Sequence, residues 1–475
     1  MSGVRRGDYR ITFAVLALGV SAYSLLQSLT VPTLPLLQRE LGASQSAASW
    51  VLTAFLLSAS VATPIVGRLG DSYGKKRMLV LSLVLLSSGA LLAGLAPNIG
   101  VMLLARVVQG AGGGCLPLSF GIIRDELPSR HVATAISLTS SLLAVGFGVG
   151  LVVAGPIVEA LDYHWLALLP MLVASAAAVG TMLLVPESPV RSGEHIPVLP
   201  AVLLGGWLVA LLVGVSRAPH WGWLSWQVLA LFLVAILLFG VWFAVERRER
   251  IPLIDLRMMA RRGVWTANLV AFLIGIAMYG SFGLYPQFDQ TPTSTGYGFG
   301  ASVAEVGQMM LPSAVLTFVC GLCSASLAAR FGSRAVISVG SAITAGGILM
   351  AAFAHAERWQ MYVAGGLTGL GAGLVFACLA NAVLDAVPPA QTGVATGMNS
   401  NIRTVGGAFG SAVMTSLVTA QLLPSGYPTE HGYVVGFIFL GVAGVFAAVA
   451  ALLIPAGRIR QEQALVGSAT VSEAA

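Results

Sequence analysis

The sequence contains few charged residues for its length. Of its 475 residues, Asp, Glu, Lys and Arg make up 9% and hydrophobic residues make up 57%, and the mean hydropathy is +0.87. A soluble domain carries about 25% charged residues, so this composition excludes an ordinary soluble protein and places most of the chain in lipid. The net charge of +6 does not indicate nucleic acid as a partner, because the surplus Lys and Arg lie between apolar runs, where they set membrane topology.

Cysteine and histidine are scarce as well. All four cysteines lie within apolar runs, and the C-x-x-C of Cys320 and Cys323 only places two small packing residues on one helix face. The six histidines are scattered over loops and the ends of the runs, which argues against the cluster of reactive groups that a membrane enzyme would need. The sequence therefore predicts no cofactor, no metal and no enzymatic activity.

The apolar runs predict an all-α integral membrane protein. Fourteen runs approach the roughly 20 residues that cross a bilayer. The first run follows a basic N-terminus and is too long for the core of a signal peptide, so it is predicted to be a retained span. The approximate ranges are Ile11–Leu37, Ala47–Val66, Met78–Ala96, Ile99–Ile122, Ala133–Ala160, His164–Val185, Val198–Val215, Ser225–Val245, Val264–Phe288, Ser302–Ala329, Ala335–Ala354, Trp359–Ala386, Gly393–Leu423 and Tyr433–Ile454.

Lys and Arg are distributed unevenly between the two sides of these spans. With the N-terminus inside, 20 of the 25 lie in cytoplasmic segments, 3 lie in outer loops, and 2, Arg106 and Arg403, lie within spans. This bias predicts an even number of spans with both termini in the cytoplasm, in the inner cell membrane.

The chain also contains an internal repeat of roughly 260 residues. The glycine-rich sequence that starts at Gln109 is echoed at Thr368, and Ala329-Arg-Phe-Gly-Ser-Arg334 is a weakened echo of the sequence around Gly74. Repeated halves that meet at a central site are a common plan of membrane transporters. We predict an N-terminal six-helix bundle over residues 1–192, an inserted helix pair over 193–250, a C-terminal six-helix bundle over 251–457 and a cytoplasmic tail over 458–475.

The stretch from Gly67 to Arg77, GRLGDSYGKKR, lies between the second and third runs and is predicted to be a short cytoplasmic loop. Its glycines would let the chain turn sharply, and Asp71 is suited to cap the N-terminus of a neighbouring helix. The stretch resembles the loop between the second and third helices of the major facilitator superfamily of transporters. The residues that carry this resemblance are Gly67, Asp71, Gly74, Lys75, Lys76 and Arg77.

With its fourteen runs and its repeat, the chain resembles the fourteen-helix drug:proton antiporter branch of that superfamily. The resemblance implies a proton-coupled exporter of small amphiphilic drugs or antibiotics that works as a monomer in the lipid bilayer. It also implies that Asp71 closes the cytoplasmic side against the start of the thirteenth span near Gly393. An exporter dedicated to one endogenous metabolite is the alternative, and a membrane enzyme or receptor is disfavoured. The sequence contains no nucleotide-binding loop, so the energy should come from an ion gradient.

Two arginines lie near the middle of their spans. Arg106 opens Arg106-Val-Val-Gln109-Gly110, which resembles the fourth-helix arginine motif that the superfamily uses in proton coupling. Arg403 lies in a glycine-rich stretch that resembles the thirteenth helix of the fourteen-helix branch. An arginine at bilayer depth is costly and usually faces a cavity. A structural role, with the arginine bound to backbone carbonyl groups, is the alternative for both.

Glycines and a proline in the fifth span resemble a degraded form of the glycine-proline motif of antiporters. Gly155 and Pro156 keep the core of the motif, Gly150 lies close before them, and Leu151 stands where the motif has its first glycine. The resemblance favours antiport. Ordinary helix packing through small residues is the alternative.

The first span lacks the aspartate that members of the branch often carry. The corresponding position is Leu26, so a proton site must lie elsewhere. Asp289 ends the ninth span and Glu305 lies in the first turn of the tenth, and each is a candidate coupling group at the outer mouth of the cavity. A solvated carboxylate, or for Glu305 one near a helix start, is the alternative.

We predict a cavity lined by Arg106 and Arg403, with Gln27, Tyr279 and Asn381 as further candidates for its lining. A side chain that faces the protein core is the default alternative for each of these three. No acidic residue lies at the depth of the two arginines. Such a cavity should favour neutral or anionic amphiphiles over lipophilic cations.

Overall fold

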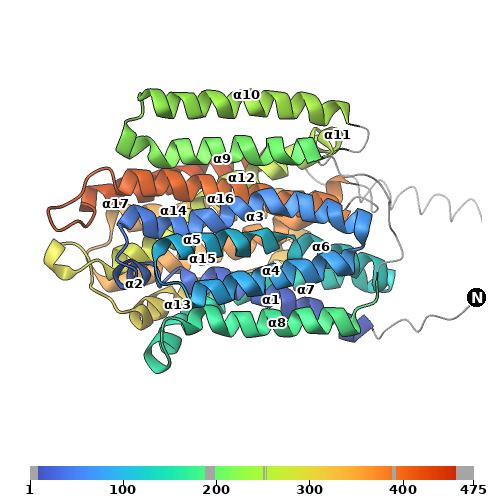
Figure 1. Ribbon diagram of the computed structural model, residues 1–475, viewed down its shortest axis with the longest axis horizontal. Coiled ribbons are helices and arrows are strands. Elements are labelled where there is room, and N and C mark those ends of the chain that lie inside the picture. The colour runs from blue at the N-terminus through green and yellow to red at the C-terminus, as the bar shows by residue number, and fades with distance from the viewer. Residues whose placement is uncertain (1–8, 188–197, 250–251, 253, 388–391, 456–475) are drawn as a thin grey trace, which may run out of the picture.

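The computed structural model describes residues 9–187, 198–249, 252, 254–387 and 392–455, and within them the chain is almost entirely helical (Figure 1). The first group of helices comprises α1 (Tyr9–Thr30), α2 (Leu34–Glu40), α3 (Gln45–Tyr73), α4 (Lys75–Gly94), α5 (Ile99–Ala111), α6 (Cys115–Glu126), α7 (Ser129–Ala160) and α8 (Trp165–Leu184), with the 3-10 turn η1 (Gly112–Gly114) between α5 and α6. Next come α9 (Val198–Trp221), α10 (Trp226–Arg248) and the short α11 (Leu256–Met259). The last group comprises α12 (Arg262–Gln290), the 3-10 turn η2 (Thr293–Thr295), α13 (Val303–Phe331), α14 (Ser333–Phe353), α15 (Arg358–Ala386), α16 (Thr392–Val418) and α17 (Glu430–Ala451).

Twelve helical segments of the described chain are long and apolar enough to cross a membrane. Helices α7 and α16, which have 32 and 27 residues, are not among the twelve. In helix α7 the apolar stretch among the fully described residues is Gly148–Ala160, and α16 carries two asparagines and an arginine. An all-helical membrane protein is therefore confirmed.

The first predicted span, Ile11–Leu37, was too long. The structure ends α1 at Thr30 and begins a separate helix, α2, at Leu34. Pro32 and Pro35 explain the break, because proline lacks a backbone N–H group and disfavours helical geometry in the residue before it.

The first and last groups of helices pack by the same plan. In the first group α1 contacts α7 and α8, α4 contacts α8 and α5, and α3 contacts α5. In the last group α12 contacts α16 and α17, α14 contacts α17 and α15, and α13 contacts α15. The two most extensive contacts between the groups are those of α7 with α13 and of α16 with α3, and these also correspond to each other. The internal repeat seen in the sequence thus appears as a repeated arrangement of helices.

Helices α9 and α10 form an outer layer at one edge of the molecule (Figure 1). Helix α9 packs on α16 and α3, and α10 packs on α9. The contact is apolar: Leu204 and Leu208 of α9 and Trp242 of α10 belong to one buried cluster that includes side chains of α3 and α16. Helix α10 leaves most of its large apolar side chains exposed, as expected for a helix that faces lipid.

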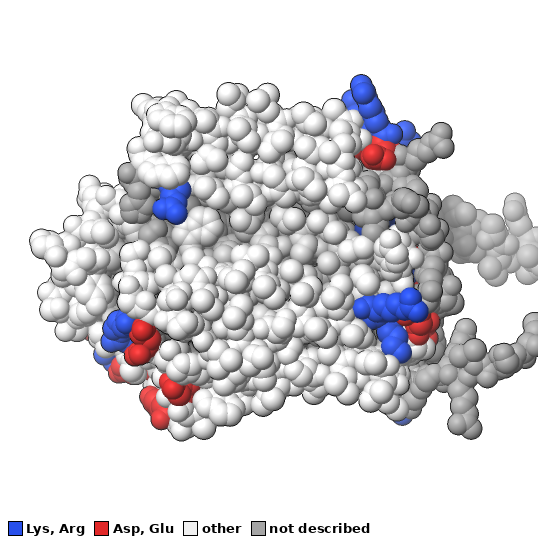
Figure 2. All heavy atoms as spheres, in the orientation of Figure 1, with Lys and Arg blue, Asp and Glu red and all other residues white. Residues whose placement is uncertain are grey.

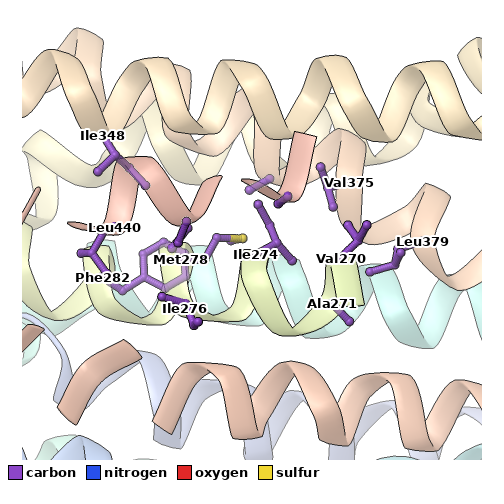
Figure 3. Packing of buried hydrophobic residues seen from close by; sticks show 14 of the residues in the cluster. Val270, Ala271, Ile274, Ile276, Met278, Phe282, Ile348, Val375, Leu379 and Leu440 are labelled. Atoms are coloured by element: carbon purple, nitrogen blue, oxygen red, sulfur yellow. The ribbon is translucent and has the colours of Figure 1, made fainter. Parts of the chain in front are cut away.

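The core of the last group is built around α12. Val270, Ile274, Met278 and Phe282 of α12 pack against residues of α14, α15 and α17 (Figure 3). These side chains hold α12 in the centre of its group, and Met278 and Phe282 also reach the wall of a cavity between the groups.

Charged side chains gather at the two ends of the molecule, with a broad uncharged band between them (Figure 2). We call the end at which α1 begins the N-terminal end, and the end at which α1 finishes the opposite end. An uncharged girdle of this kind matches the hydrocarbon layer of a bilayer.

Candidate functional site

A cavity of about 290 Å³ lies between the two groups of helices. Its walls come from α1, α6 and α7 of the first group and from α12, α13, α15 and α16 of the last. Four of the residues predicted to line a cavity do so: Gln27, Tyr279, Asn381 and Arg403. Segments that lie far apart in the sequence therefore meet at one central site, as the repeat predicted.

The cavity extends toward the N-terminal end. Its lining includes Ile136 near the start of α7, Thr396 near the start of α16 and Ser324 in the last third of α13, and all three positions lie toward that end. At the opposite end the groups are in contact. The Gln290 side chain donates a hydrogen bond to the Pro32 carbonyl at 2.7 Å, and Gly155 of α7 lies against the backbone of Ala304 in α13.

Arg403 has few partners within the protein. Its Nη2 donates a hydrogen bond to Ser400 Oγ at 3.2 Å, and its guanidinium carbon lies 4.5 Å from the centre of the Phe376 ring. Its Nε is buried without a hydrogen-bond partner among the described residues. Phe376 thus holds the guanidinium plane in place by a cation–π contact, while part of its hydrogen-bonding capacity stays unused.

Arg106 lies outside the cavity, and its predicted place in the lining was wrong. Its side chain is 2% exposed and lies between α1 and α3. Nε donates to the Val51 carbonyl at 3.1 Å, and Nη1 donates to the Leu26 carbonyl at 3.4 Å and to Gln109 Oε1 at 2.6 Å. Gln109 is also fully buried, so these two residues form an internal polar cluster that joins three helices.

Asp289 lies in a separate, smaller space near the opposite end. Its side chain is 1% exposed, and Oδ1 is buried without a hydrogen-bond partner among the described residues. Beside it is a void of about 10 Å³, also lined by Tyr285 and Thr368, which is about the space that one water molecule needs. Phe282 and Ser313 line both this void and the main cavity. Asp289 is therefore separated from the main cavity by a thin wall.

Glu305 does not line the cavity. It accepts a hydrogen bond from the Ser302 backbone N–H at 2.8 Å while Ser302 Oγ accepts from the Glu305 N–H at 3.2 Å, which is a capping box at the start of α13. Its carboxylate also pairs with Arg358 Nη1 at 2.9 Å, and both side chains are largely exposed. The structure thus shows Glu305 in the capping position that was its alternative.

The stretch from Gly67 to Arg77 is not a loop. Helix α3 continues to Tyr73 and α4 begins at Lys75, so only Gly74 is non-helical. Its φ of 111° and ψ of 128° are open to glycine and strained for other residues. Gly67 and Gly70 lie inside α3, where Gly70 gives room to the Leu118 side chain. The prediction of a loop failed because polar and charged residues do not by themselves end a helix. The helix continues where its backbone hydrogen bonds and its packing are maintained.

The buried lysine of this stretch is paired within the first group of helices. Lys75 is buried, and its Nζ lies 2.5 Å from Asp125 Oδ2 and 3.8 Å from Asp71 Oδ1. The predicted capping of α16 by Asp71 stays a prediction, because residues 388–391 and the surroundings of Gly393 are outside the described residues.

Sequence reasoning missed Glu187, which follows α8. Its Oε1 accepts a hydrogen bond from the Lys76 backbone N–H at 3.2 Å, and its Oε2 lies 3.6 Å from Arg77 Nε. A carboxylate at the start of a helix stabilises it through the helix dipole and the free N–H groups. The only signal in the sequence is an acid after a span on the same predicted side as the basic run, and no spacing rule links the two.

The fifth-span glycines lie at helix contacts. A side chain at Gly150 would overlap Ser28 of α1, and one at Gly155 would overlap Ala304 of α13. Pro156 is inside α7 and exposed. Gly155 therefore brings the two groups together at the opposite end, whereas Gly150 packs α7 within its own group.

Comparisons with known proteins agree with this architecture. The family model described as Major Facilitator Superfamily matches residues 16–201 and 267–469. The chain belongs to the major facilitator superfamily, and it is a transporter and not an enzyme. The unmatched residues between the two segments include all of α10 and most of α9.

Curated relatives are named for drug and antibiotic resistance. The chain is 28% identical to the puromycin resistance protein pur8 of Streptomyces alboniger, over 93% of this chain and 90% of that one. It is 25% identical to the tetracenomycin C resistance and export protein of Streptomyces glaucescens, over 89% and 78%. It is 26% identical to a multidrug resistance protein B homolog of Mycobacterium tuberculosis (strain CDC 1551 / Oshkosh), over 80% and 71%.

A solved structure has the same fold. The human organic anion transporter MFSD10 (TETRAN) aligns with a TM-score of 0.64 and 17% identity, over 93% of this chain and 99% of that one. At this identity the likeness concerns the fold alone.

Proposed function

We propose that this protein exports small amphiphilic molecules in exchange for protons, by exposing its central cavity to the two sides of the membrane in turn. The observation that carries the proposal is the cavity between two similarly built groups of helices, which extends toward the N-terminal end, while the groups are in contact at the opposite end. Two packed groups that rock about a central site are the usual machinery of alternating access. The names of the curated relatives support drugs or antibiotics as the exported class.

The proposed architecture has fourteen spans with both termini in the cytoplasm. Helices α7 and α16 occupy corresponding places in the two groups, so we count both as spans beside the twelve segments given above. The excess of Lys and Arg on the N-terminal side supports the orientation. The gap in the family match supports α9 and α10 as an inserted pair. With the cytoplasm at the N-terminal end, the cavity shown here faces inward.

Asp289 is the residue that we propose to carry the proton. An ionised carboxylate without a partner is costly to bury unless it takes up a proton, and Asp289 has a water-sized void beside it that borders the main cavity. Opening of the closed end would expose Asp289 to the outside, where it would bind a proton. Closure would return it to its present place, from which the proton leaves through the cavity to the cytoplasm.

The test uses purified protein in liposomes with an imposed inside-acid pH gradient and a fluorescent pH dye. We expect substrate-dependent proton efflux from the wild type, no such efflux from Asp289→Asn, and unchanged efflux from Glu305→Gln, because Glu305 serves as a helix cap. Substrate binding should persist in all three proteins. Normal efflux from Asp289→Asn would remove that residue from the mechanism. An absence of efflux with every compound, alongside intact binding, would contradict proton antiport.

A dedicated exporter of one endogenous metabolite is the second candidate. The cavity of about 290 Å³ is at the small end of the range for ligand sites, which favours a narrow set of substrates. Efflux with only one of a panel of structurally different compounds would select this candidate.

A further inference from the structure

The main cavity carries one uncompensated positive charge. Of the described residues that line it, Arg403 is the only one with a charged side chain. Arg106 is enclosed among backbone carbonyl groups elsewhere, and Asp289 borders the smaller void instead of the cavity. No carboxylate among the described residues pairs with Arg403, whose contacts are a hydroxyl group and an aromatic ring.

The guanidinium of Arg403 is held in place with part of its donor capacity unused. The Phe376 ring lies against its plane, Ser400 accepts one hydrogen bond from Nη2, and Nε has no partner among the described residues. A planar guanidinium presents its donors as a fork that matches the two oxygens of a carboxylate or sulfonate. A cation in a low-dielectric site without an anion is costly, so an incoming anion gains more there than it would in water.

The remaining wall of the cavity is apolar and aromatic. Phe120, Phe282 and Phe318 line it together with aliphatic side chains, and its uncharged polar groups are amides, such as those of Gln27 and Asn381, and hydroxyl groups. Apolar walls with a few placed polar groups are the usual composition of a small-molecule site. Such walls accept a flat apolar ligand, and the single cation favours a ligand that carries a negatively charged group.

We infer that the cavity binds an aromatic amphiphile with one anionic oxygen group, which sits on Arg403 while the apolar body lies among the phenylalanines. The inference rests on the proposed function and narrows its substrate class from amphiphiles in general to organic monoanions. A lipophilic cation would face Arg403 with no acid to balance it, so the same arginine rejects cations. Export of an anion in exchange for a proton moves positive charge inward in both steps, so an inside-negative potential should drive it.

The test compares two fluorescent probes that share one ring system. Anilinonaphthalene sulfonate carries a negative charge, and N-phenylnaphthylamine is its neutral counterpart. Binding of each probe to protein in lipid nanodiscs would be measured as the fluorescence increase above that of protein-free nanodiscs. We expect Arg403→Gln to lower the affinity for the sulfonate by about tenfold or more, because a charge-assisted hydrogen bond is lost. The affinity for the neutral probe should stay within about twofold of the wild-type value.

Two further variants keep this result decisive. Arg403→Lys retains the charge, so it should restore most of the binding of the sulfonate, and retained binding of the neutral probe shows that each variant is folded. Arg358→Gln removes an exposed arginine far from the lining and should leave both affinities unchanged. Equal affinity of wild type and Arg403→Gln for the sulfonate would overturn the inference, as would tighter binding of an aromatic quaternary ammonium probe than of the sulfonate.

This binding assay is independent of transport. Charge-selective binding without proton efflux in liposomes would preserve the anion site and contradict the proposed antiport. Proton efflux coupled to a cation, with no dependence on Arg403, would preserve antiport and contradict the anion site.

Discussion

The turns at Gly74 and Gly332 join corresponding helices of the two groups, α3 with α4 and α13 with α14, and they share one backbone conformation. Their φ and ψ angles are 111° and 128° at Gly74 and 84° and 142° at Gly332. Their surroundings differ. The Glu187 carboxylate lies 2.5 Å from the position that a Cβ atom would take at Gly74, whereas no described atom lies within 4 Å of that position at Gly332.

Among the described residues, ion pairs are found at the first of these turns and not at the second. The residue after Gly74 is Lys75, which is buried and paired with Asp125, whereas the residue after Gly332 is the uncharged, partly exposed Ser333. The comparison teaches that the repeat specifies the backbone of both turns through a glycine, while the ion pairs depend on α6 and on the residues after α8, which differ between the groups. We therefore expect the α3–α4 turn to be the more rigid of the two.

The protein contains its own reporters for testing this difference. Cys115 of α6 and Cys378 of α15 are buried free thiols, one in each group of helices, whereas Cys320 and Cys323 are more accessible. With the other cysteines replaced by alanine, reaction of one remaining buried thiol with a fluorescent maleimide during heating reports the unfolding of its own group. The midpoint of a thiol is the temperature at which half of it has reacted.

The largest effect is expected for Lys75→Met. The substitution removes the ammonium group that lies 2.5 Å from the Asp125 carboxylate, which is 8% exposed and has Arg124 at 3.6 Å as a more distant charged neighbour. Removing one partner of a buried ion pair costs about 3 kcal/mol or more. The Cys115 midpoint should fall clearly. Ser333→Met at the corresponding turn is the control, and its Cys378 midpoint should change little, because the effect of a surface substitution is usually within about 0.5 kcal/mol. Equal shifts would refute the asymmetry.

The two glycines should differ in their tolerance of alanine. Gly332→Ala meets only backbone strain, which costs about 1–3 kcal/mol in this positive-φ conformation. Gly74→Ala meets the same strain and must also displace the Glu187 carboxylate. Its cost in unfolding free energy should therefore be higher by about 1 kcal/mol, because the hydrogen bond between Glu187 and the Lys76 N–H is lost. The thiol midpoints of the two variants, each read in its own group, measure the difference. A lower cost at Gly74 than at Gly332 would show that Glu187 yields freely.

Gly67→Ala should stabilise the protein slightly. Gly67 lies in α3 with no atom within 4 Å of the added methyl group, and alanine is favoured over glycine inside a helix by up to about 1 kcal/mol. The Cys115 midpoint should rise. A lower Cys115 midpoint would mean that the segment before Gly74 is not helical in the membrane and forms the loop that the sequence predicted.

The smallest effect is expected for Glu187→Gln. The glutamine keeps an oxygen for the Lys76 N–H and loses only the charge that faces Arg77, whose side chain is 66% exposed. Exposed ion pairs contribute about 0.2–1 kcal/mol, and salt should screen this part. The Cys115 midpoint at low and high salt measures it. A large loss that salt does not reduce would indicate a structural role beyond charge.

The two arginines show where prediction from the sequence stopped. Arg106 and Arg403 lie at similar depth in their spans, so hydropathy and spacing treat them alike. The structure gives Arg106 three acceptors from α1, α3 and its own helix, and places Arg403 in the wall of the cavity. The sequence shows that position 26 carries leucine and not an acid. That the backbone carbonyl of Leu26 accepts a hydrogen bond from Arg106 depends on how α1 lies relative to α5.

The acids show the same limit. Asp289 and Glu305 both lie at helix ends and were equal candidates. Glu305 has its partner, Ser302, three residues away, and a capping box is visible in the sequence. The burial of Asp289 depends on α13 and α15, which supply the other walls of the void beside it, and no local pattern records this.

The sequence by itself determined that the chain is helical and lies in a membrane, that it repeats, and that a glycine forms the turn between α3 and α4. These properties depend on the hydropathy and the backbone freedom of residues that are close together in the sequence, so a local stretch of the chain is enough to recognise them. Only the tertiary structure decided which arginine meets the cavity, which acid is buried, and that Glu187 holds the start of α4. Each of these depends on which side chains from distant helices lie within a few ångströms, and packing alone determines that.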